Sequence, residues 1–295
     1  MKEKHRVACI ILNYNDSETT IQLVNSIKGY VAIHCIVIVD NASTDCSLEK
    51  LNKLKSEKIS IHSAKNNSGY GAGNNLGVQI AKEKYGCDIA LIANPDVMFD
   101  ESCIKELVGC FDRNPEAALV APVQMDKDGH VLKSTAWEIP SVWEYILSSL
   151  FLIGKMYKAE RIPLQKYWSI GCVAGAFLAV RIEYFLLAGG YDERIFLYGE
   201  ETTLGYRLKQ AGFQSFVVTD VYYLHKHAVS INKSIPGAAK RKKMLLDSRL
   251  YIVEHYLGCS KGVYYFAKIV FGIAIVEEYM KYFLRLFRHT GRRTS

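Results

Sequence analysis

The sequence predicts an α/β protein whose core is a doubly wound, mostly parallel β-sheet. Short apolar runs alternate along the first half of the chain with segments that favour helices, which is the pattern of strand–helix units joined by right-handed crossovers. Each apolar run is followed by a loop rich in Asn, Asp, Ser or Gly, as expected where parallel strands end at one edge of a sheet. With 295 residues, 49% of them hydrophobic, the chain is long enough to bury a large core.

The expected core strands are apolar runs, in chain order residues 6–12, 36–39, 59–62, 89–92 and 118–122. The helices expected between and after them cover residues 17–27, residues 47–54, a segment ending at Tyr85, and residues 101–111. The first run is apolar without interruption, which is typical of a central parallel strand covered on both faces. Ser17 can cap the first helix, because its hydroxyl accepts a hydrogen bond from a backbone N–H of the first turn.

Asp96 is the carboxylate around which a site is expected to form. It follows the run at residues 89–92 and Pro95, which ends that strand because proline cannot donate to a sheet ladder. Asp96 is therefore expected at the carboxyl end of a core strand, where open α/β sheets bind ligands. A carboxylate there can take a divalent cation that in turn holds a diphosphate. Taken alone, Asp96 could equally serve only to cap the next helix.

Two further polar loops are expected at the same edge. Asn13-Tyr14-Asn15 follows the first strand, and Asp40-Asn41 follows the second. Amides can read a nucleobase and a carboxylate can take a ribose hydroxyl, so a nucleotide is the ligand expected here. A simple Asx turn is the alternative for Asp40-Asn41.

The glycine-rich segment Gly69-Tyr70-Gly71-Ala72-Gly73 opens the helix that ends at Tyr85. Its spacing differs from G-x-G-x-x-G and it follows the third strand instead of the first, which disfavours a dinucleotide-binding dehydrogenase. The glycines are expected to let the backbone approach a ligand at the N-terminus of that helix.

The second half of the chain is expected to form an acceptor side. Residues 137–168 are aromatic and apolar without clean periodicity and are interpreted as a cover over the acceptor. Residues 126–129 predict a hairpin-type turn. Residues 170–180 predict a strand of small residues, which permits close approach of a ligand or of neighbouring backbone. The elements expected after it are helices at 183–188 and 202–211, then a strand at 216–218 that leads to His225.

Charge and cysteine content bear on location. Residues 1–6 are polar without a leader, and 8 scattered cysteines lack a C-x-x-C pair, so a cytoplasmic protein with reduced thiols and no zinc site is expected. Residues 238–295 carry 12 Lys and Arg against 4 Asp and Glu, which predicts an anionic partner. Nucleic acid is disfavoured because base-stacking and groove-reading motifs are missing.

The basic tail, residues 238–295, is also expected to contain an amphipathic helix. Its apolar stretch at 263–275 is shorter than the ~20 residues that a membrane span requires. The charged side is expected to comprise Glu278, Lys281, Arg285 and Arg288, and the apolar side Ile275, Tyr279, Phe283 and Phe287. With the basic cluster at 240–243, such a helix can lie on the inner face of a membrane. Packing on the rest of the chain or on a second subunit is the alternative.

Six segments carry a resemblance to a known family: residues 11–15, 39–45, 67–75, 94–96, 189–193 and 196–201. Together and in this order they resemble the inverting nucleotide-sugar glycosyltransferases of family 2, most of all the rhamnosyltransferase-like branch. The resemblance implies a GT-A fold over residues 1–237, with a nucleotide-sugar half to about residue 125 and an acceptor half from about residue 126. Residues 238–295 would follow as a helical tail.

The resemblance implies a role for each matching residue. The residues implied in donor binding are Asn13, Tyr14, Asn15, Asp40, Asn41, Asn67, Gly69, Gly71, Asn74 and Asn94. Asp96, in an N-P-D form of the family's D-x-D motif, and His225 would hold Mg²⁺ or Mn²⁺, with Ser230 closing the histidine motif. Glu201 would be the catalytic base and Glu200 a neighbour that supports it or binds acceptor. The family usually has Asp at position 201 and again two residues later, where this chain has Thr203.

The implied reaction is inverting transfer of a sugar from a nucleotide diphosphate donor to a saccharide or lipid-linked acceptor in cell-surface polysaccharide synthesis. The cation would neutralise the leaving diphosphate, and the base would take the proton of the attacking hydroxyl. The branch implies a deoxyhexose donor such as dTDP-rhamnose, with UDP-linked hexoses or N-acetylhexosamines as rivals. A catalytically impaired nucleotide-sugar-binding or scaffold module is the alternative function, favoured by Glu201 and Thr203. A homodimer also remains open.

Overall fold

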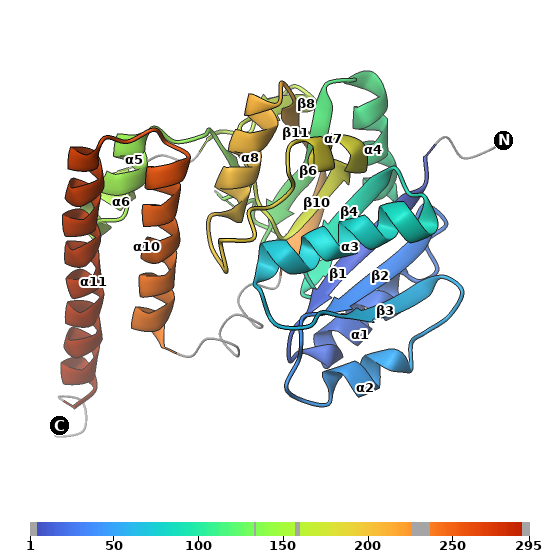
Figure 1. The fold of residues 1–295 in the computed structure, drawn as a ribbon, viewed down its shortest axis with the longest axis horizontal. Helices are drawn as coiled ribbons and strands as arrows, with labels where there is room; N and C mark the ends of the chain where they lie inside the picture. The colour runs from blue at the N-terminus through green and yellow to red at the C-terminus, as the bar shows by residue number, and fades with distance from the viewer. Residues whose placement is uncertain (1–4, 133, 157–159, 226–236, 291–295) are drawn as a thin grey trace. The chain divides into compact units, whose positions relative to one another are not determined.

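The structure is a computed structural model that describes residues 5–132, 134–156, 160–225 and 237–290, without the side chains of residues 282–290. It divides into two compact units (Figure 1). Unit 1 comprises Met1–Ile139, Ala159–Phe196 and Glu200–Ser234, and unit 2 comprises Pro140–Lys158, Leu197–Gly199 and Ile235–Ser295. Residues 140–158, expected on the acceptor side of the first domain, thus group with the tail.

The central sheet of unit 1 has nine strands among the described residues, in the order β3-β2-β1-β4-β10-β6-β11-β5, with β8 paired to β11. Their bounds are β1 Val7–Asn13, β2 Cys35–Asp40, β3 Ile59–Ser63, β4 Ile89–Ala93, β5 Val97–Met98, β6 Ala117–Met125, β8 Tyr167–Ile170, β10 Phe177–Arg181 and β11 Gln214–His225. The first four strands pair in parallel, as do β6 and β11. The predicted α/β class with a mostly parallel sheet is confirmed.

The small-residue run at 170–180 forms two strands instead of the single strand predicted. β9 (Cys172–Val173) pairs with β7 (Ala136–Trp137) in a separate two-stranded sheet, and β10 then enters the central sheet antiparallel to both β4 and β6. Between them the backbone changes partners, since Ala174 N donates to Thr135 O and Ala176 O accepts from Asn94 N. The turn between β9 and β10 therefore lies directly beside the end of β4.

Helices cover both faces of the sheet, as the uninterrupted apolar strands predict. One face packs against α1 (Ser17–Ile27), α2 (Ser47–Asn52) and α4 (Glu101–Arg113), and the other against α3 (Tyr70–Tyr85), α7 (Ile182–Leu187) and α8 (Glu200–Gln210). Two helix starts differ from the prediction. Asp16, not Ser17, occupies the N-cap position of α1, and α8 begins at Glu200 instead of residue 202.

Two glycines of α3 allow this helix to lie close across β1 and β2 (Figure 1). A Cβ on Gly73 would approach Leu12 Cδ1 to 2.3 Å, and one on Gly77 would approach Ile10 Cγ2 to the same distance. These contacts are much closer than two carbon atoms tolerate, so a side chain at either position would push the helix off the sheet. Both glycines therefore serve helix–sheet packing.

Unit 2 is helical: α5 (Val142–Leu147), α6 (Phe151–Met156), α10 (Ala238–His255) and α11 (Lys261–Thr290). Ser141 and Glu144 form a capping box at the start of α5. The sequence analysis did not predict this helix. Arg249 of α10 ties α5 in place, because its Nη1 donates to Tyr145 O, Ser148 Oγ and Ser149 Oγ. Over the part of the chain that the structure describes, none of the helices reaches the length and hydropathy needed to cross a membrane.

Candidate active site

The loops after β1 and β2 form one hydrogen-bonded network at the carboxyl end of the sheet. Asn13 lies opposite Asp40 in the β1–β2 ladder, and its Nδ2 donates to Asp40 Oδ1 at 2.8 Å. Ser43 donates to both oxygens of the same carboxylate, through Oγ at 2.6 Å and backbone N at 3.0 Å. Thr20 Oγ1 donates to Asn13 Oδ1 at 2.8 Å. The network therefore fixes the shape of this edge before any ligand binds.

A second set of bonds joins the loop after β2 to the start of α3. Asn41 Nδ2 donates to Asn67 Oδ1 at 2.9 Å and to Gly69 O at 3.1 Å, and Gly69 N donates back to Asn67 Oδ1 at 3.1 Å. Gly69 has φ of +99°, and a Cβ there would lie 2.3 Å from Phe196 O. Glycine is thus required at position 69 both for its backbone conformation and for its contact with the loop that precedes α8.

Exposure divides the residues predicted to bind donor. Asn13, Asp40 and Asn41 are 0, 1 and 3% exposed, so their side chains build the loops and offer little surface to a ligand. Tyr14, Asn15, Asn67 and Asn94 are half-buried and remain the candidates for direct contact. Asn15 stands at φ +51°, and its side chain bonds to the backbone N and the hydroxyl of Thr44.

Gly71 and Asn74, also predicted at the donor site, face the protein interior. A Cβ on Gly71 would lie 2.8 Å from Tyr191 Cβ, so the absence of a side chain serves packing on that tyrosine. Asn74 is 1% exposed, and its Nδ2 donates to Tyr70 O one turn earlier in the helix. Glycine at positions 71, 73 and 77 thus serves packing, a role that the sequence did not predict.

Asp96 and His225, predicted as metal ligands from distant parts of the chain, lie together. His225 Nε2 is 3.2 Å from Asp96 Oδ1, and both side chains are largely buried. The pairing of β5 with β11 sets their spacing, since Val97 lies opposite His225. The side-chain amide of Gln124 lies 2.9 Å from His225 Nδ1 and fixes the ring. A carboxylate oxygen and an imidazole nitrogen this close together are a donor set that suits a divalent cation. Ser230 lies outside the described residues.

Glu201, at the start of α8, reaches the turn between β9 and β10. A Cβ on Gly175 would lie 2.8 Å from Glu201 Oε1, and the Gly175 N–H donates to the carboxylate. Burial raises the pKa of Glu201 above its ordinary value, while the hydrogen bonds from the backbone N–H groups of residues 175 and 201 oppose that rise. The carboxylate therefore binds a proton more strongly than an exposed glutamate does, and its position is fixed. Both are properties of a general base.

Tyr223 connects the two candidate centres. Its pKa is raised by burial first, and then by the negative charges of Glu201 and of Asp96. The backbone joins the two centres as well, since Ala176 O, next to Gly175, accepts from Asn94 N at 2.8 Å, two residues before Asp96. Tyr70 borders the same site, because its hydroxyl donates to Gly175 O at 2.7 Å.

Glu200 and Thr203, the neighbours of Glu201 in α8, are both buried. Glu200 is only 4% exposed. Thr203, where the family usually has Asp, is fully buried, and its hydroxyl donates to Glu200 O at 3.0 Å. Position 203 therefore closes the first turn of the helix in this chain.

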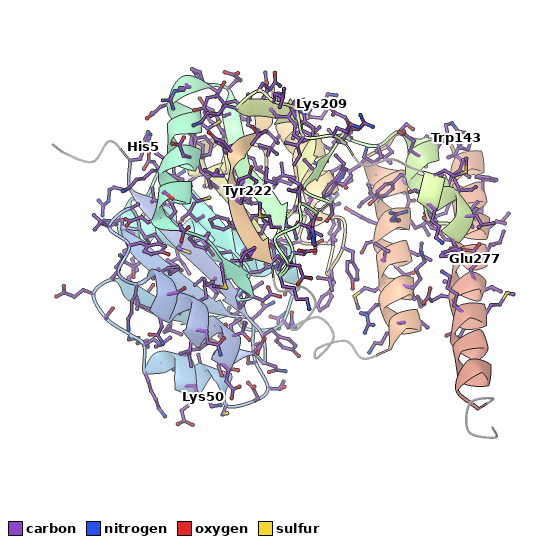
Figure 2. The ribbon with its side chains drawn as sticks, turned by 180° about the vertical axis from the view of Figure 1, so that it is seen from behind. His5, Lys50, Trp143, Lys209, Tyr222 and Glu277 are labelled. Atoms are coloured by element: carbon purple, nitrogen blue, oxygen red, sulfur yellow. The ribbon has the colours of Figure 1, made fainter. Side chains whose placement is uncertain are left out.

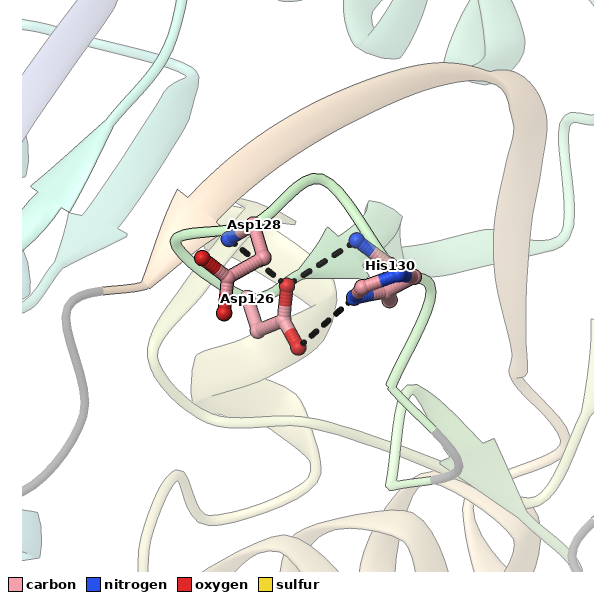
Figure 3. A group of neighbouring side chains, drawn as sticks. All are labelled: Asp126, Asp128 and His130. Carbon is pink, nitrogen blue, oxygen red and sulfur yellow. Dashed lines mark hydrogen bonds and ion pairs between the residues drawn. The ribbon is translucent and has the colours of Figure 1, made fainter.

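A third group of side chains with metal-ligand chemistry, Asp126, Asp128 and His130, lies in the predicted hairpin turn (Figure 3). Asp126 Oδ1 accepts from the backbone N of Asp128 and of His130, each at 2.9 Å, and His130 Nδ1 is 3.5 Å from Asp126 Oδ2. These bonds are those of an Asx-type turn, and Asp128 and His130 are exposed. The geometry of the turn accounts for the group without a cation.

Three residues of the site were missed by the sequence analysis. Gly175 could have been found, because a run of small residues indicates close approach. Gln124 and Tyr223 carry no such signal, since each is an ordinary strand residue whose role depends on the neighbouring strand.

Comparisons with known proteins identify the family and the fold. Residues 8–186 match the model of the family described as glycosyl transferase family 2. An N-acetylglucosaminyl-diphospho-decaprenol L-rhamnosyltransferase of Mycobacterium tuberculosis (strain ATCC 25618 / H37Rv) is 30% identical over 213 residues, covering 67% of this chain and 68% of that protein. Rhamnosyltransferase WbbL of Escherichia coli (strain K12) is 26% identical over 179 residues, covering 59% and 66%. The chain thus spans about two thirds of these relatives' length.

Solved structures share the fold at low identity. GalNAc-T7 with UDP, GalNAc and Mn²⁺ superposes with a TM-score of 0.64 at 16% identity, over 87% of this chain and 50% of that one. The mannosyltransferase PcManGT from Pyrobaculum calidifontis, with GDP-Man and Mn²⁺, gives a TM-score of 0.58 at 15% identity, over 92% and 74%. Both are glycosyltransferases of the GT-A fold, and the fold is what the likeness establishes.

Proposed function

From the premise that this chain belongs to glycosyl transferase family 2, we propose that it transfers a sugar from a nucleotide diphosphate donor to a saccharide or lipid-linked acceptor, with inversion at the anomeric carbon. One observation carries the proposal: the turn that contacts Glu201 through Gly175 is bonded to the end of β4 through Ala176 O and Asn94 N, so the candidate base adjoins the strand end that carries the Asp96–His225 pair. Inverting transfer by a single displacement requires a base on one side of the anomeric carbon and a group that holds the diphosphate on the other.

The donor nucleotide is held by the loops after β1 and β2. Tyr14 and Asn15 keep exposed surface toward the ligand, while the buried Asn13–Asp40 bond holds the loops in shape. Because this network is formed in advance, little conformational entropy is lost when the nucleotide binds.

Asp96 and His225 would hold the divalent cation, Mg²⁺ or Mn²⁺, beside the donor diphosphate. Bound there, the cation supplies Lewis-acid neutralisation of the charge that develops on the departing diphosphate. Gln124 orients the imidazole from behind, so that Nε2 and not Nδ1 faces the site.

Glu201 takes the proton of the acceptor hydroxyl as that oxygen attacks. The new bond forms between the acceptor oxygen and the anomeric carbon, the bond from that carbon to the donor diphosphate breaks, and its electron pair leaves with the nucleoside diphosphate. The raised pKa of Glu201 brings its proton affinity closer to that of the group it serves. The enclosure by Gly175 and Tyr70 keeps the carboxylate in line.

The donor sugar is proposed from the relatives' names. Two of them are rhamnosyltransferases, which favours a deoxyhexose such as dTDP-L-rhamnose, and one acts on a lipid-linked acceptor, N-acetylglucosaminyl-diphospho-decaprenol. An acceptor of that kind would bring the protein to the inner face of a membrane, in a pathway of cell-surface polysaccharide synthesis.

A donor panel with the purified full chain tests the proposal. With a polyprenyl-diphosphate-linked N-acetylglucosamine acceptor, dTDP-L-rhamnose is expected to react at least about tenfold faster than UDP-glucose, UDP-N-acetylglucosamine or GDP-mannose, since a pocket fitted to an apolar group such as the C6 methyl discriminates against a near analogue by about 10–200-fold. NMR of the product linkage reads the anomeric configuration. Binding of nucleotide sugar without turnover of any donor would instead support a binding or scaffold module.

Gly175→Ala is expected to lower kcat about tenfold to a hundredfold with little change in the donor KM, because the added Cβ displaces the Glu201 carboxylate. The displaced carboxylate loses the N–H bond that lowers its pKa, so the acidic limb of the pH profile should move to higher pH. In a Glu201→Asp background, whose side chain is one methylene shorter, the same substitution should cost less. Gly29→Ala, which meets no atom within 4 Å, is the control. An equal loss in both backgrounds would contradict the positioning role.

A further inference from the structure

We infer that unit 2 binds an anionic lipid surface through the outward face of α11. Five apolar residues form this face: Tyr265, Ile269, Ile273, Val276 and Met280, with exposed fractions of 61, 64, 49, 57 and 59%. Their spacing of three or four residues places them on one side of the helix. The inference concerns unit 2 alone and does not depend on the proposed reaction.

The opposite side of α11 already supplies the core of unit 2. Ala267, Val270, Phe271 and Ala274 are between 0 and 4% exposed and pack toward α10 and α5. A surface helix ordinarily has polar residues on the face that it turns to water. Here the second face is apolar as well, and contiguous apolar surface of this kind marks a protein or membrane contact.

The charged residues that follow turn inward, contrary to the sequence prediction. Lys281 is half-buried with its ammonium 4.0 Å from the centre of the Phe151 ring, and it pairs with Glu278 at 3.4 Å. Glu277, labelled in Figure 2, accepts from Phe151 N through Oε2. The outward side of α11 is therefore left with apolar residues. Of the residues predicted on the apolar side, Tyr279 is exposed and Ile275 is half-buried. Arg285, Arg288, Phe283 and Phe287 lie beyond the described side chains.

The charge around this face selects the partner. Residues 261–276 contain no acidic residue, and Lys261 and Lys268 are both exposed beside the apolar stripe. A second copy of the chain packed on this face would bring like charges together, whereas an anionic headgroup layer neutralises them. Trp143 of α5, 50% exposed and labelled in Figure 2, lies against Phe266 at 5.9 Å between ring centres. Aromatic rings of this kind favour the headgroup level of a bilayer.

Co-sedimentation of the full chain with vesicles tests the inference. Binding is expected to phosphatidylcholine vesicles that contain phosphatidylglycerol, and to weaken in high salt. The variant Ile269→Ser with Ile273→Ser is expected to bind roughly tenfold more weakly for each residue changed, because half-exposed isoleucines lose the surface that they would insert. Lys261→Gln with Lys268→Gln should cost about fivefold per charge on anionic vesicles only. Val31→Ser with Leu187→Ser, two apolar residues of unit 1 that are 75 and 68% exposed, is the control and should bind normally.

Three outcomes would overturn the inference. They are failure of the full chain to bind either vesicle, equal loss in the control, and a dimer in light scattering that the Ile269→Ser, Ile273→Ser variant dissociates. The last would make the face a contact between two copies. Turnover of a water-soluble acceptor should be unchanged in this variant, so a failure here is distinguishable from a failure of the proposed reaction.

Discussion

Glu201→Gln is expected to lower kcat by about 10²–10⁴-fold, because a general base contributes on that order to proton removal. The amide is close in size to the carboxylate and can still accept from the Gly175 N–H, so the fold and donor binding should be retained. In the unchanged protein, the acidic limb of the pH dependence of kcat/KM is expected above 4.5. The reason is that burial raises the pKa of Glu201 from that value, and the base works only when deprotonated.

Glu200→Gln is the matched control, since this neighbouring carboxylate sits at the first position of the same helix. Its effect on kcat is expected to be much smaller. A larger loss of kcat in Glu200→Gln than in Glu201→Gln would make Glu200 the base. Mild losses of equal size would mean that neither residue is the base. Differential scanning calorimetry of both variants separates loss of folding from loss of chemistry.

Removal of the divalent cation by a chelator is expected to abolish transfer, and Mg²⁺ or Mn²⁺ to restore it. Asp96→Asn should weaken Mn²⁺ binding beyond the roughly 10–100-fold loss seen when a residue behind a ligand is changed. Paramagnetic resonance of Mn²⁺, in the presence of nucleoside diphosphate, measures this without reference to turnover. The structural basis is the close approach of Asp96 to His225 at the end of β11.

Asp126→Asn provides the control for this experiment. Asp126 belongs to the exposed group in the hairpin turn, where backbone N–H groups occupy its carboxylate. Mn²⁺ affinity should therefore remain unchanged. Full activity in excess chelator would contradict the metal dependence, and loss of Mn²⁺ binding in Asp126→Asn alone would place the cation at the hairpin turn instead of at Asp96.

The polar loops illustrate how motif and contact differ. The pattern of Asn13, Asp40 and Asn41 after two strands predicted that these residues meet at one edge of the sheet, and they do, because parallel strands end together. Whether such side chains face a ligand or each other depends on bond lengths and directions across neighbouring strands. In the structure all three side chains make hydrogen bonds within the protein. The surface that a nucleotide can contact belongs to neighbouring residues such as Tyr14 and Asn15.

In the tail too, the sequence predicted the element, whereas its contacts depend on packing. Its composition indicated an amphipathic helix near an anionic partner, and α11 is a helix of 30 residues. The direction of its faces could not be read from spacing alone, because both sides of residues 261–276 are apolar. Packing against α10 and α5 decides which side is covered, and it covers the one that contains Val270 and Phe271.

Patterns in the sequence were sufficient to predict the fold class, the strands that carry Asp40 and Asp96 at their ends, and the family. These depend on local periodicity and on motifs that are contiguous in the chain. The antiparallel entry of β10, the position of Gln124 beside His225, and the contact of Gly175 with Glu201 became visible only in the folded chain. Each of these joins residues far apart in the sequence. Such contacts are set by strand order and side-chain packing, which no local pattern of residues encodes.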